Sequence, residues 1–325
     1  MGLRHVQAAR DAGLDVVGGC DRDAGTRARL PADVPLHADL DALLAAGPEA
    51  LVVATNGPSH AAIAGRAMEA GVRRLLIEKP LGTSLRDARA VQAKAAETGT
   101  RIVVGVSRRY SPFYDHLADW LGQGPIGPVR AFRAALGASG PGCNGTHLID
   151  LGLRLLGAPP ARVWGRLRDV GLPNPRGPSF HDPGGWAVFE TQDGGRLHLE
   201  MSDDFGYSTG FDILGRWGRV HIDELQGVLQ ARARDEAGRT APLHRIATPL
   251  ADIEVPVAPP RIDITELAAA EQADLFAATP PRADAALGSM LLQAVVGMHM
   301  ASETGRGIGW DEIPAWAGDR EFRFT

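Results

Sequence analysis

The residue of this chain whose type and position best suit it to handling a proton is Lys79. It follows the apolar residues 75–77 within the triplet Glu78-Lys79-Pro80. A strand that ends in this triplet would place the lysine at the carboxyl edge of a parallel sheet, where open α/β folds bind ligands. Pro80 restricts the backbone and can form a cis peptide bond, which would aim the lysine into the crevice. A lysine can serve as a general acid or base when its surroundings tune the pKa.

Lysine is scarce in this chain, which adds weight to Lys79. Only Lys79 and Lys94 are lysines, so 32 of the 34 basic residues are arginine. Arginine cannot release a proton and does not fit a compact proton-donor site. A lysine retained in such a chain therefore indicates a position that requires an ammonium group. Lys94 lies on the polar face of a predicted helix, and we interpret it as a surface residue without a catalytic role.

Composition and charge exclude several classes of protein. The chain has 325 residues, 44% of them hydrophobic, and a net charge of −5 without a basic block, which predicts a globular protein with two domains or one large one and no nucleic-acid or membrane partner. Cys20 and Cys143 are too few for a disulfide framework or a four-ligand zinc site, so we expect a reducing compartment. No signal peptide or run of about 18 apolar residues is evident, and a cytoplasmic location is expected.

The first 107 residues alternate β-branched runs with amphipathic stretches, as repeated βα units do. Ser59 and Ser84 are predicted to cap two of the helices. We expect a doubly wound parallel sheet in a domain over residues 1–107, with strands at 15–20, 50–54, 74–77 and 102–106 and helices at 3–12, 40–46, 59–70 and 85–98.

From residue 108 onward the pattern changes to short alternating runs, typical of an antiparallel sheet. The turn at residues 192–195 predicts a hairpin, and residues 235–261 look irregular. We expect an α+β domain over residues 108–325, with strands at 129–136, 186–191, 196–202, 211–215 and 218–222 and helices at 147–156 and 283–304 on one face. The other face would stay open and partly apolar, which predicts a homodimer or homotetramer joined through it.

Part of a dinucleotide-binding pattern lies at the start of the chain. Gly2 precedes a predicted helix, and Asp21 follows the next predicted strand, where a carboxylate would accept hydrogen bonds from a ribose diol. Gly2 fits the third glycine of the pattern, but the preceding strand and the first two glycines are absent. An ordinary αβ unit with an acidic turn explains these residues equally well. Because a missing central strand would cost a great deal of stability, we expect Met1 to be an internal methionine of a longer chain, with a genuine truncation as the alternative.

Taken together, these motifs resemble the Gfo/Idh/MocA family of nicotinamide-dependent sugar and cyclitol oxidoreductases. The similarity runs over nearly the whole chain and is carried by an ordered set: the Asp21 turn, Thr55-Asn56-Gly57-Pro58-Ser59-His60, Glu78-Lys79-Pro80, residues 104–110, residues 145–150, residues 211–220 and residues 304–306.

The resemblance implies a Rossmann domain, a second domain with an open-faced sheet, and an active site between them. It implies that Lys79 hydrogen-bonds the reacting hydroxyl and that His147 is the general acid or base. Asp21 would favour NAD, although Arg22 could accept the extra phosphate of NADP. The remaining implied site residues are Gly2, Thr55, Asn56, His60, Glu78 and Pro80 for the cofactor and Arg109, Tyr110, Cys143, Asn144 and Asp150 for a carbohydrate-like substrate.

One position departs from the family. The aspartate that the family commonly has four residues before the histidine is Cys143 here, and a thiol cannot share a proton as a carboxylate does. Two alternatives therefore stay open: a cofactor-poor, non-catalytic homologue that binds a sugar-like ligand or a partner, and a redox-neutral lyase or hydrolase that uses NAD transiently. No metal is expected, although His147, Asp150, His181 and Asp182 form a candidate ligand set.

Overall fold

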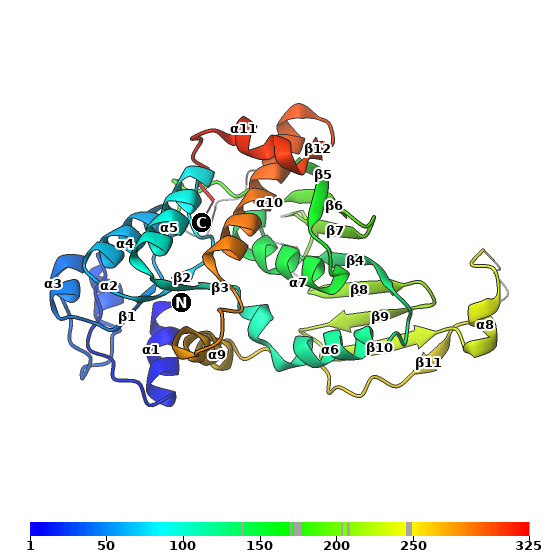
Figure 1. The fold of residues 1–325 in the computed structure, drawn as a ribbon, viewed down its shortest axis with the longest axis horizontal. Coiled ribbons are helices and arrows are strands. Elements are labelled where there is room, and N and C mark those ends of the chain that lie inside the picture. Colours follow the sequence, from blue (N-terminus) through cyan, green and yellow to red (C-terminus); the bar gives the residue numbers. More distant parts are fainter. Residues whose placement is uncertain are drawn as a thin grey trace.

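The computed structural model describes residues 1–137, 139–169, 171, 174, 177–202, 204–206, 209–244 and 249–324, and contains a parallel sheet and a larger mixed sheet (Figure 1). The expected fold class is confirmed: a Rossmann-like parallel sheet is followed by a mostly antiparallel sheet with helices.

The parallel sheet has three strands in the order β1-β2-β3: β1 Ala50–Val53, β2 Arg74–Glu78 and β3 Arg101–Gly105. Alternate side chains of the strands point to opposite faces, and both faces are buried. Helices α4 Gly57–Glu69 and α5 Leu85–Thr98 follow β1 and β2 and cover one face. Helices α1 Gly2–Asp11 and α9 Ile264–Phe276 pack against each other on the opposite side (Figure 1).

Helix α9 comes from the C-terminal half of the sequence, yet it contacts β2 and β3 of the parallel sheet. Its buried Leu267 and Leu275 join Leu76 and Val103 of those strands in one apolar cluster. The face of the N-terminal sheet is thus completed by a segment about 160 residues further along the chain, a contact that no local pattern in the sequence could predict. The domain boundary after residue 107 stays a prediction.

The strand expected at residues 15–20 is wrong. This segment makes only one isolated parallel bridge, between Gly19 and Leu36, and the described part of the chain contains no strand between it and β1. Without a neighbour on its other side, the segment has no ladder to join. Two short helices follow, α2 Ala24–Arg27 and α3 Leu40–Ala45.

One of the two predicted helix caps is confirmed, and the other is wrong. Ser84 caps α5, where its hydroxyl accepts from the Asp87 backbone N–H at 3.0 Å, as expected. Helix α4 instead begins after Asn56, and the Ser59 hydroxyl donates to Thr55 Oγ1 at 2.7 Å. Pro58 explains the earlier start, because proline is favoured in the first helical turn, where its missing N–H costs nothing.

The second sheet has nine strands in the order β11-β10-β9-β8-β4-β7-β6-β5-β12, and all neighbours are antiparallel except β4 and β7. The residues 192–195 hairpin joins β6 and β7 as predicted. The strands are β4 Val129–Ala135, β5 Pro160–Leu167, β6 Gly185–Thr191, β7 Arg196–Met201, β8 Gly210–Gly215, β9 Gly218–Asp223, β10 Val228–Ala233, β11 Ala251–Ile253 and β12 Ile308–Gly309.

Helices α7 Thr146–Leu156 and α10 Ala285–Thr304 cover one face of this sheet. Sequence patterns missed β5, β10 and β12, and the stretch expected to be irregular contains α8 Glu236–Thr240 and β11. The remaining helical elements are η1 Ser107–Tyr110, α6 Pro112–Gly122, η2 Pro141–Gly145, η3 Trp310–Glu312 and α11 Ile313–Ala317. Among the described helices, α10 alone is long and apolar enough to cross a membrane by length and composition, and it is packed against β5.

Candidate active site

Lys79 lies just beyond the end of β2, and the Lys79–Pro80 peptide is cis, as the sequence suggested. Its Nζ donates to the backbone carbonyl of Cys143 at 2.7 Å and lies 3.9 Å from the Cys143 thiol. Cys143 stands where the family that the sequence resembles commonly has an aspartate. It therefore binds the lysine through its main-chain carbonyl and not through a side-chain carboxylate. A peptide carbonyl keeps the ammonium oriented without adding a negative charge beside it.

The Cys143 carbonyl belongs to η2, a single π-helical turn that runs directly into α7. The Asp182 carboxylate accepts from the backbone N–H groups of Gly142 at 2.9 Å and Cys143 at 2.8 Å. A Cβ atom at Gly142 would lie 2.5 Å from the Phe324 Cβ atom, so only glycine fits there. Asp182 and Phe324 thus fix a turn that sequence reasoning associated only with its cysteine.

His147 occupies the first turn of α7 and is buried, with no hydrogen-bond partner for Nδ1. Burial holds the pKa of His147 well below its usual value, and the charges of Lys79 and Arg108 lower it further. The imidazole is consequently neutral at neutral pH. A neutral, unpartnered ring beside a cation can accept a proton from a bound hydroxyl group.

Two arginines after β3 are tied to buried acids. Arg109 Nε donates to both carboxylate oxygens of Asp150 at 3.1 Å, which brings two predicted substrate residues together. Burial raises the pKa of Asp150, and the Arg109 guanidinium opposes that shift. Arg108 binds Glu224 through Nε at 2.9 Å, a pair that the sequence did not reveal.

Two other predicted substrate residues are placed differently. Tyr110 is buried on the α9 side of the parallel sheet, where its hydroxyl donates to Asp274 Oδ2 at 2.7 Å. Asn144 is half-buried in the same turn as Cys143. The structure therefore groups Cys143, Asn144 and His147 near Lys79 and leaves Tyr110 outside that group.

The predicted cofactor residues lie on the carboxyl side of the parallel sheet but differ in how firmly they are held. Thr55 and Asn56 are exposed just after β1, and His60 links their loop to the lysine loop, with ring nitrogens 3.0 Å from the Thr55 carbonyl oxygen and 2.7 Å from that of Pro80. Gly2 is the first residue of α1.

Asp21 and Arg22 are both exposed. One carboxylate oxygen of Asp21 accepts from the Asp23 backbone N–H at 2.8 Å, and the Arg27 guanidinium donates to the carbonyls of Asp21 at 2.9 Å and Arg22 at 2.8 Å. The acidic turn is therefore held only by local contacts, and an oxygen of Asp21 remains for a ligand.

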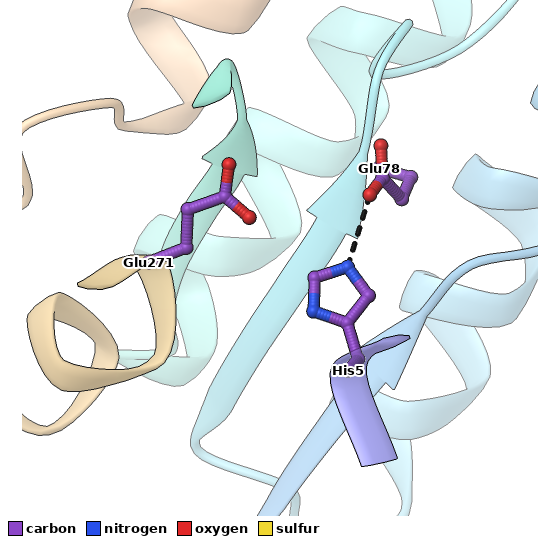
Figure 2. Close-up of side chains that lie close together, drawn as sticks. All are labelled: His5, Glu78 and Glu271. Atoms are coloured by element: carbon purple, nitrogen blue, oxygen red, sulfur yellow. Dashed lines mark hydrogen bonds and ion pairs between the residues drawn. The ribbon is translucent and has the colours of Figure 1, made fainter. Parts of the chain in front are cut away.

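Glu78 does not face the open crevice. It is buried, and its Oε1 lies 2.9 Å from His5 Nε2 on α1, with Glu271 of α9 facing the pair (Figure 2). Sequence reasoning did not find His5 or Glu271, since no motif joins residues so far apart. The candidate metal set of His147, Asp150, His181 and Asp182 is not assembled: within the described ranges, the one group of ligand atoms close enough for a metal is His5, Glu78 and Glu271.

Comparison with known proteins supports this arrangement. Residues 1–106 match the model of the Gfo/Idh/MocA oxidoreductase family, described as having an NAD-binding Rossmann fold. Inositol 2-dehydrogenase 1 of Saccharopolyspora erythraea is 36% identical over 135 residues, which cover 39% of this chain and 40% of that protein. The scyllo-inositol 2-dehydrogenase (NAD(+)) of Bacillus subtilis is 26% identical over 197 residues, covering 55% of this chain and 56% of that one.

The curated relatives are thus matched over only about a quarter to two thirds of their own length. Solved structures match over more of the chain. An oxidoreductase domain protein from Kribbella flavida, 23% identical, superimposes with a TM-score of 0.78 over 95% of this chain and 96% of its own. An NAD-binding protein from Listeria innocua, 20% identical, superimposes with a TM-score of 0.77 over 95% of this chain and 94% of its own. At these identities the likeness shows the fold alone.

The parallel sheet, the lysine at its carboxyl edge and the larger mixed sheet define a protein of the dinucleotide-binding α/β class. More particularly, its first 106 residues are similar to the NAD-binding Rossmann unit of the Gfo/Idh/MocA oxidoreductases.

Proposed function

We propose that the chain is an NAD-dependent oxidoreductase that interconverts a hydroxyl and a carbonyl group on a cyclitol, sugar or nucleotide sugar. The observation that carries the proposal is the placement of Lys79 at the sheet edge, held against the Cys143 turn, beside the buried, neutral His147. The names of the matched relatives, which include inositol dehydrogenases and D-apiose dehydrogenase, favour a polyhydroxylated substrate.

The residues on the carboxyl side of the sheet fit a nicotinamide dinucleotide. The Asp21 carboxylate can accept from the ribose hydroxyls, and exposed Thr55 and Asn56 can contact the central part of the molecule. The start of α1 offers backbone N–H groups to phosphate oxygens. When bound, the nicotinamide supplies a hydride acceptor or donor.

The protein's own residues would handle the proton. In the oxidation direction the substrate hydroxyl loses a proton as its carbon loses hydride. Lys79 Nζ can hydrogen-bond the hydroxyl oxygen and stabilise the developing negative charge, because the Cys143 carbonyl occupies only one of its N–H groups. His147, which burial keeps neutral, can take up the proton. In the reverse direction the same two groups return it.

Dinucleotide binding and turnover test the proposal separately. Fluorescence titration should show NAD binding, and absorbance of NADH should report turnover with a panel of inositols, aldoses and nucleotide sugars. Binding without net reduction, but with loss of a leaving group from a sugar, would favour the redox-neutral alternative. Absence of any dinucleotide binding would overturn the proposal and favour the non-catalytic one.

Self-association through the open face of the nine-stranded sheet is also proposed. Trp186 is exposed there, but Arg133 lies opposite His198 and Asp212 in the strand register, so the face is more polar than the sequence suggested. Light scattering should give a multiple of the 34.4 kDa chain mass, and a single-chain mass would rule the proposal out.

A further inference from the structure

Three chain segments that are distant in sequence bring metal-ligating atoms together inside the protein. His5 comes from α1, Glu78 from the end of β2 and Glu271 from α9, and one ligand atom from each lies within 4.8 Å of the other two. The residues are 2%, 6% and 0% exposed, respectively. Figure 2 shows Glu271 extending from α9 toward the His5–Glu78 pair. The cluster is therefore built into the packing of the two helices against the sheet.

The cluster lacks the partners that its carboxylates need. His5 is one donor for Glu78, but neither oxygen of Glu271 has a hydrogen-bond partner. The Ser107 hydroxyl is near enough to influence Glu271 without reaching hydrogen-bond geometry. Burying an acidic side chain without donors is costly, and a second carboxylate beside it increases the cost. A ligand that accepts electron pairs from both carboxylates would remove that cost.

We propose that His5, Glu78 and Glu271 bind a divalent cation, with Zn²⁺ the ion that their chemistry fits best. One imidazole nitrogen and two carboxylate oxygens are common zinc ligands, each about 2.0 to 2.2 Å from the metal. Two carboxylates also balance the charge of a divalent ion. The proposal is independent of the oxidoreductase activity.

Gln272, which follows Glu271 on α9, contacts both the backbone and the ring of His5. It donates to the His5 carbonyl at 2.9 Å, and its Nε2 lies 3.5 Å from His5 Nδ1. Binding a metal through His5 Nε2 would leave the proton of the ring on Nδ1, so Gln272 would keep its bond to the carbonyl and release the Nδ1 contact. The contact that is lost is the longer of the two.

A bound ion would clamp α1 and α9 to the end of β2. Because the three ligands lie on separate segments, the ion would bind the folded protein far better than the unfolded one and would stabilise it. It would also fix the residue next to Lys79 without touching the reacting groups.

The test uses tag-free protein stripped with a chelator and titrated with Zn²⁺ against a chromophoric zinc indicator. Wild-type protein should bind one ion per chain with a raised melting temperature, and Co²⁺ should give visible absorption bands typical of a low-coordinate site. Glu271→Gln should weaken Zn²⁺ binding by at least about tenfold, since it removes a charged ligand. Glu266→Gln, an exposed position on the same helix, is the matched control and should bind as wild type does.

Stripped wild-type protein that takes up no Zn²⁺ or Co²⁺ would overturn the proposal, and a proton on Glu271 would then account for its burial. Equal binding by wild type and Glu271→Gln would place any ion elsewhere and would overturn it as well. Circular dichroism of each metal-free variant checks folding, and His5→Gln provides a second ligand substitution if Glu271→Gln does not fold. Because NAD binding is measured separately, failure of this proposal leaves the proposed function untouched.

Discussion

The two ends of the predicted dinucleotide site are held in different ways. At the Lys79 end, the Cys143 carbonyl fixes the lysine, and Asp182 fixes the turn that carries Cys143. His5 contacts Glu78, the residue before the lysine. At the Asp21 end, the acidic turn is exposed, and its hydrogen bonds within the described part of the chain join residues no more than six positions apart. Long-range contacts restrict a side chain more strongly than a short local turn does. Long-range contacts therefore hold the lysine to which we assign proton handling, whereas only a local turn holds the residues that we propose bind the ribose.

The largest expected effect comes from removing the lysine. Lys79→Ala should lower kcat by about a hundredfold or more, because the developing negative charge loses its hydrogen-bond donor. Lys79→Arg should not restore turnover, since the planar guanidinium is bulkier than an ammonium group and does not fit a compact donor site. Steady-state rates with NAD and the best substrate provide the measurement.

Lys94→Ala is the matched control, because Lys94 pairs only with surface acids Glu69 and Glu97 among its described contacts. Its kcat should equal that of the wild type. Near-normal turnover of Lys79→Ala would show that the reaction does not depend on Lys79.

A smaller effect is expected from the turn that holds the lysine's acceptor. Asp182→Asn retains the shape but loses the charge that binds two peptide N–H groups, and kcat should fall by about tenfold. The dinucleotide affinity and KM should change little, because Asp182 positions Cys143 and is not expected to contact the cofactor. Asp169→Asn, an exposed neighbour that pairs with His181, is the control. An unchanged kcat, or a loss confined to KM, would contradict this positioning role.

The same contrast explains what the sequence could predict. Local signals located the parallel strands, the Ser84 cap and the cis Lys79–Pro80 bond, because proline and capping residues act over a few positions. Asp182 as a clamp of η2, and Glu271 beside Glu78, depend on contacts between distant segments and have no local signature. The strand predicted at residues 15–20 was wrong because a local pattern does not show whether a neighbouring strand exists. Its two valines favour a strand, but within the described chain the segment makes only one isolated β-bridge.

The pH dependence of activity should reflect the desolvated histidine. Burial keeps the pKa of His147 well below 6.5, so its neutral form persists as the pH falls through that value. An unperturbed histidine would lose about tenfold of its neutral form between pH 7.5 and 5.5. We expect kcat/KM to change by less than about threefold over that range.

The sign for stability follows from the same pKa. A histidine whose folded-state pKa is depressed contributes stability above its unfolded pKa, and that contribution is lost as the pH falls. Urea unfolding at both pH values should therefore show a smaller acid loss for His147→Gln than for the wild type. A kinetic transition centred near pH 6.5 that disappears in His147→Gln would show that the ring is not desolvated in the working enzyme.

The smallest effect is expected at the Asp21 end. Asp21→Ser should reduce the affinity for NAD by only a few-fold, because serine retains an oxygen that can hydrogen-bond the ribose and the turn is exposed. The same change removes the carboxylate that would repel the additional phosphate of NADP, so the preference for NAD should narrow by about tenfold. Asp15→Ser, an exposed position in the preceding segment, controls for the change in net charge. Fluorescence titration of both cofactors measures the preference. If the wild type already binds NADP more tightly than NAD, Arg22 rather than Asp21 governs recognition of the cofactor. The turn then binds the additional phosphate of NADP instead of repelling it.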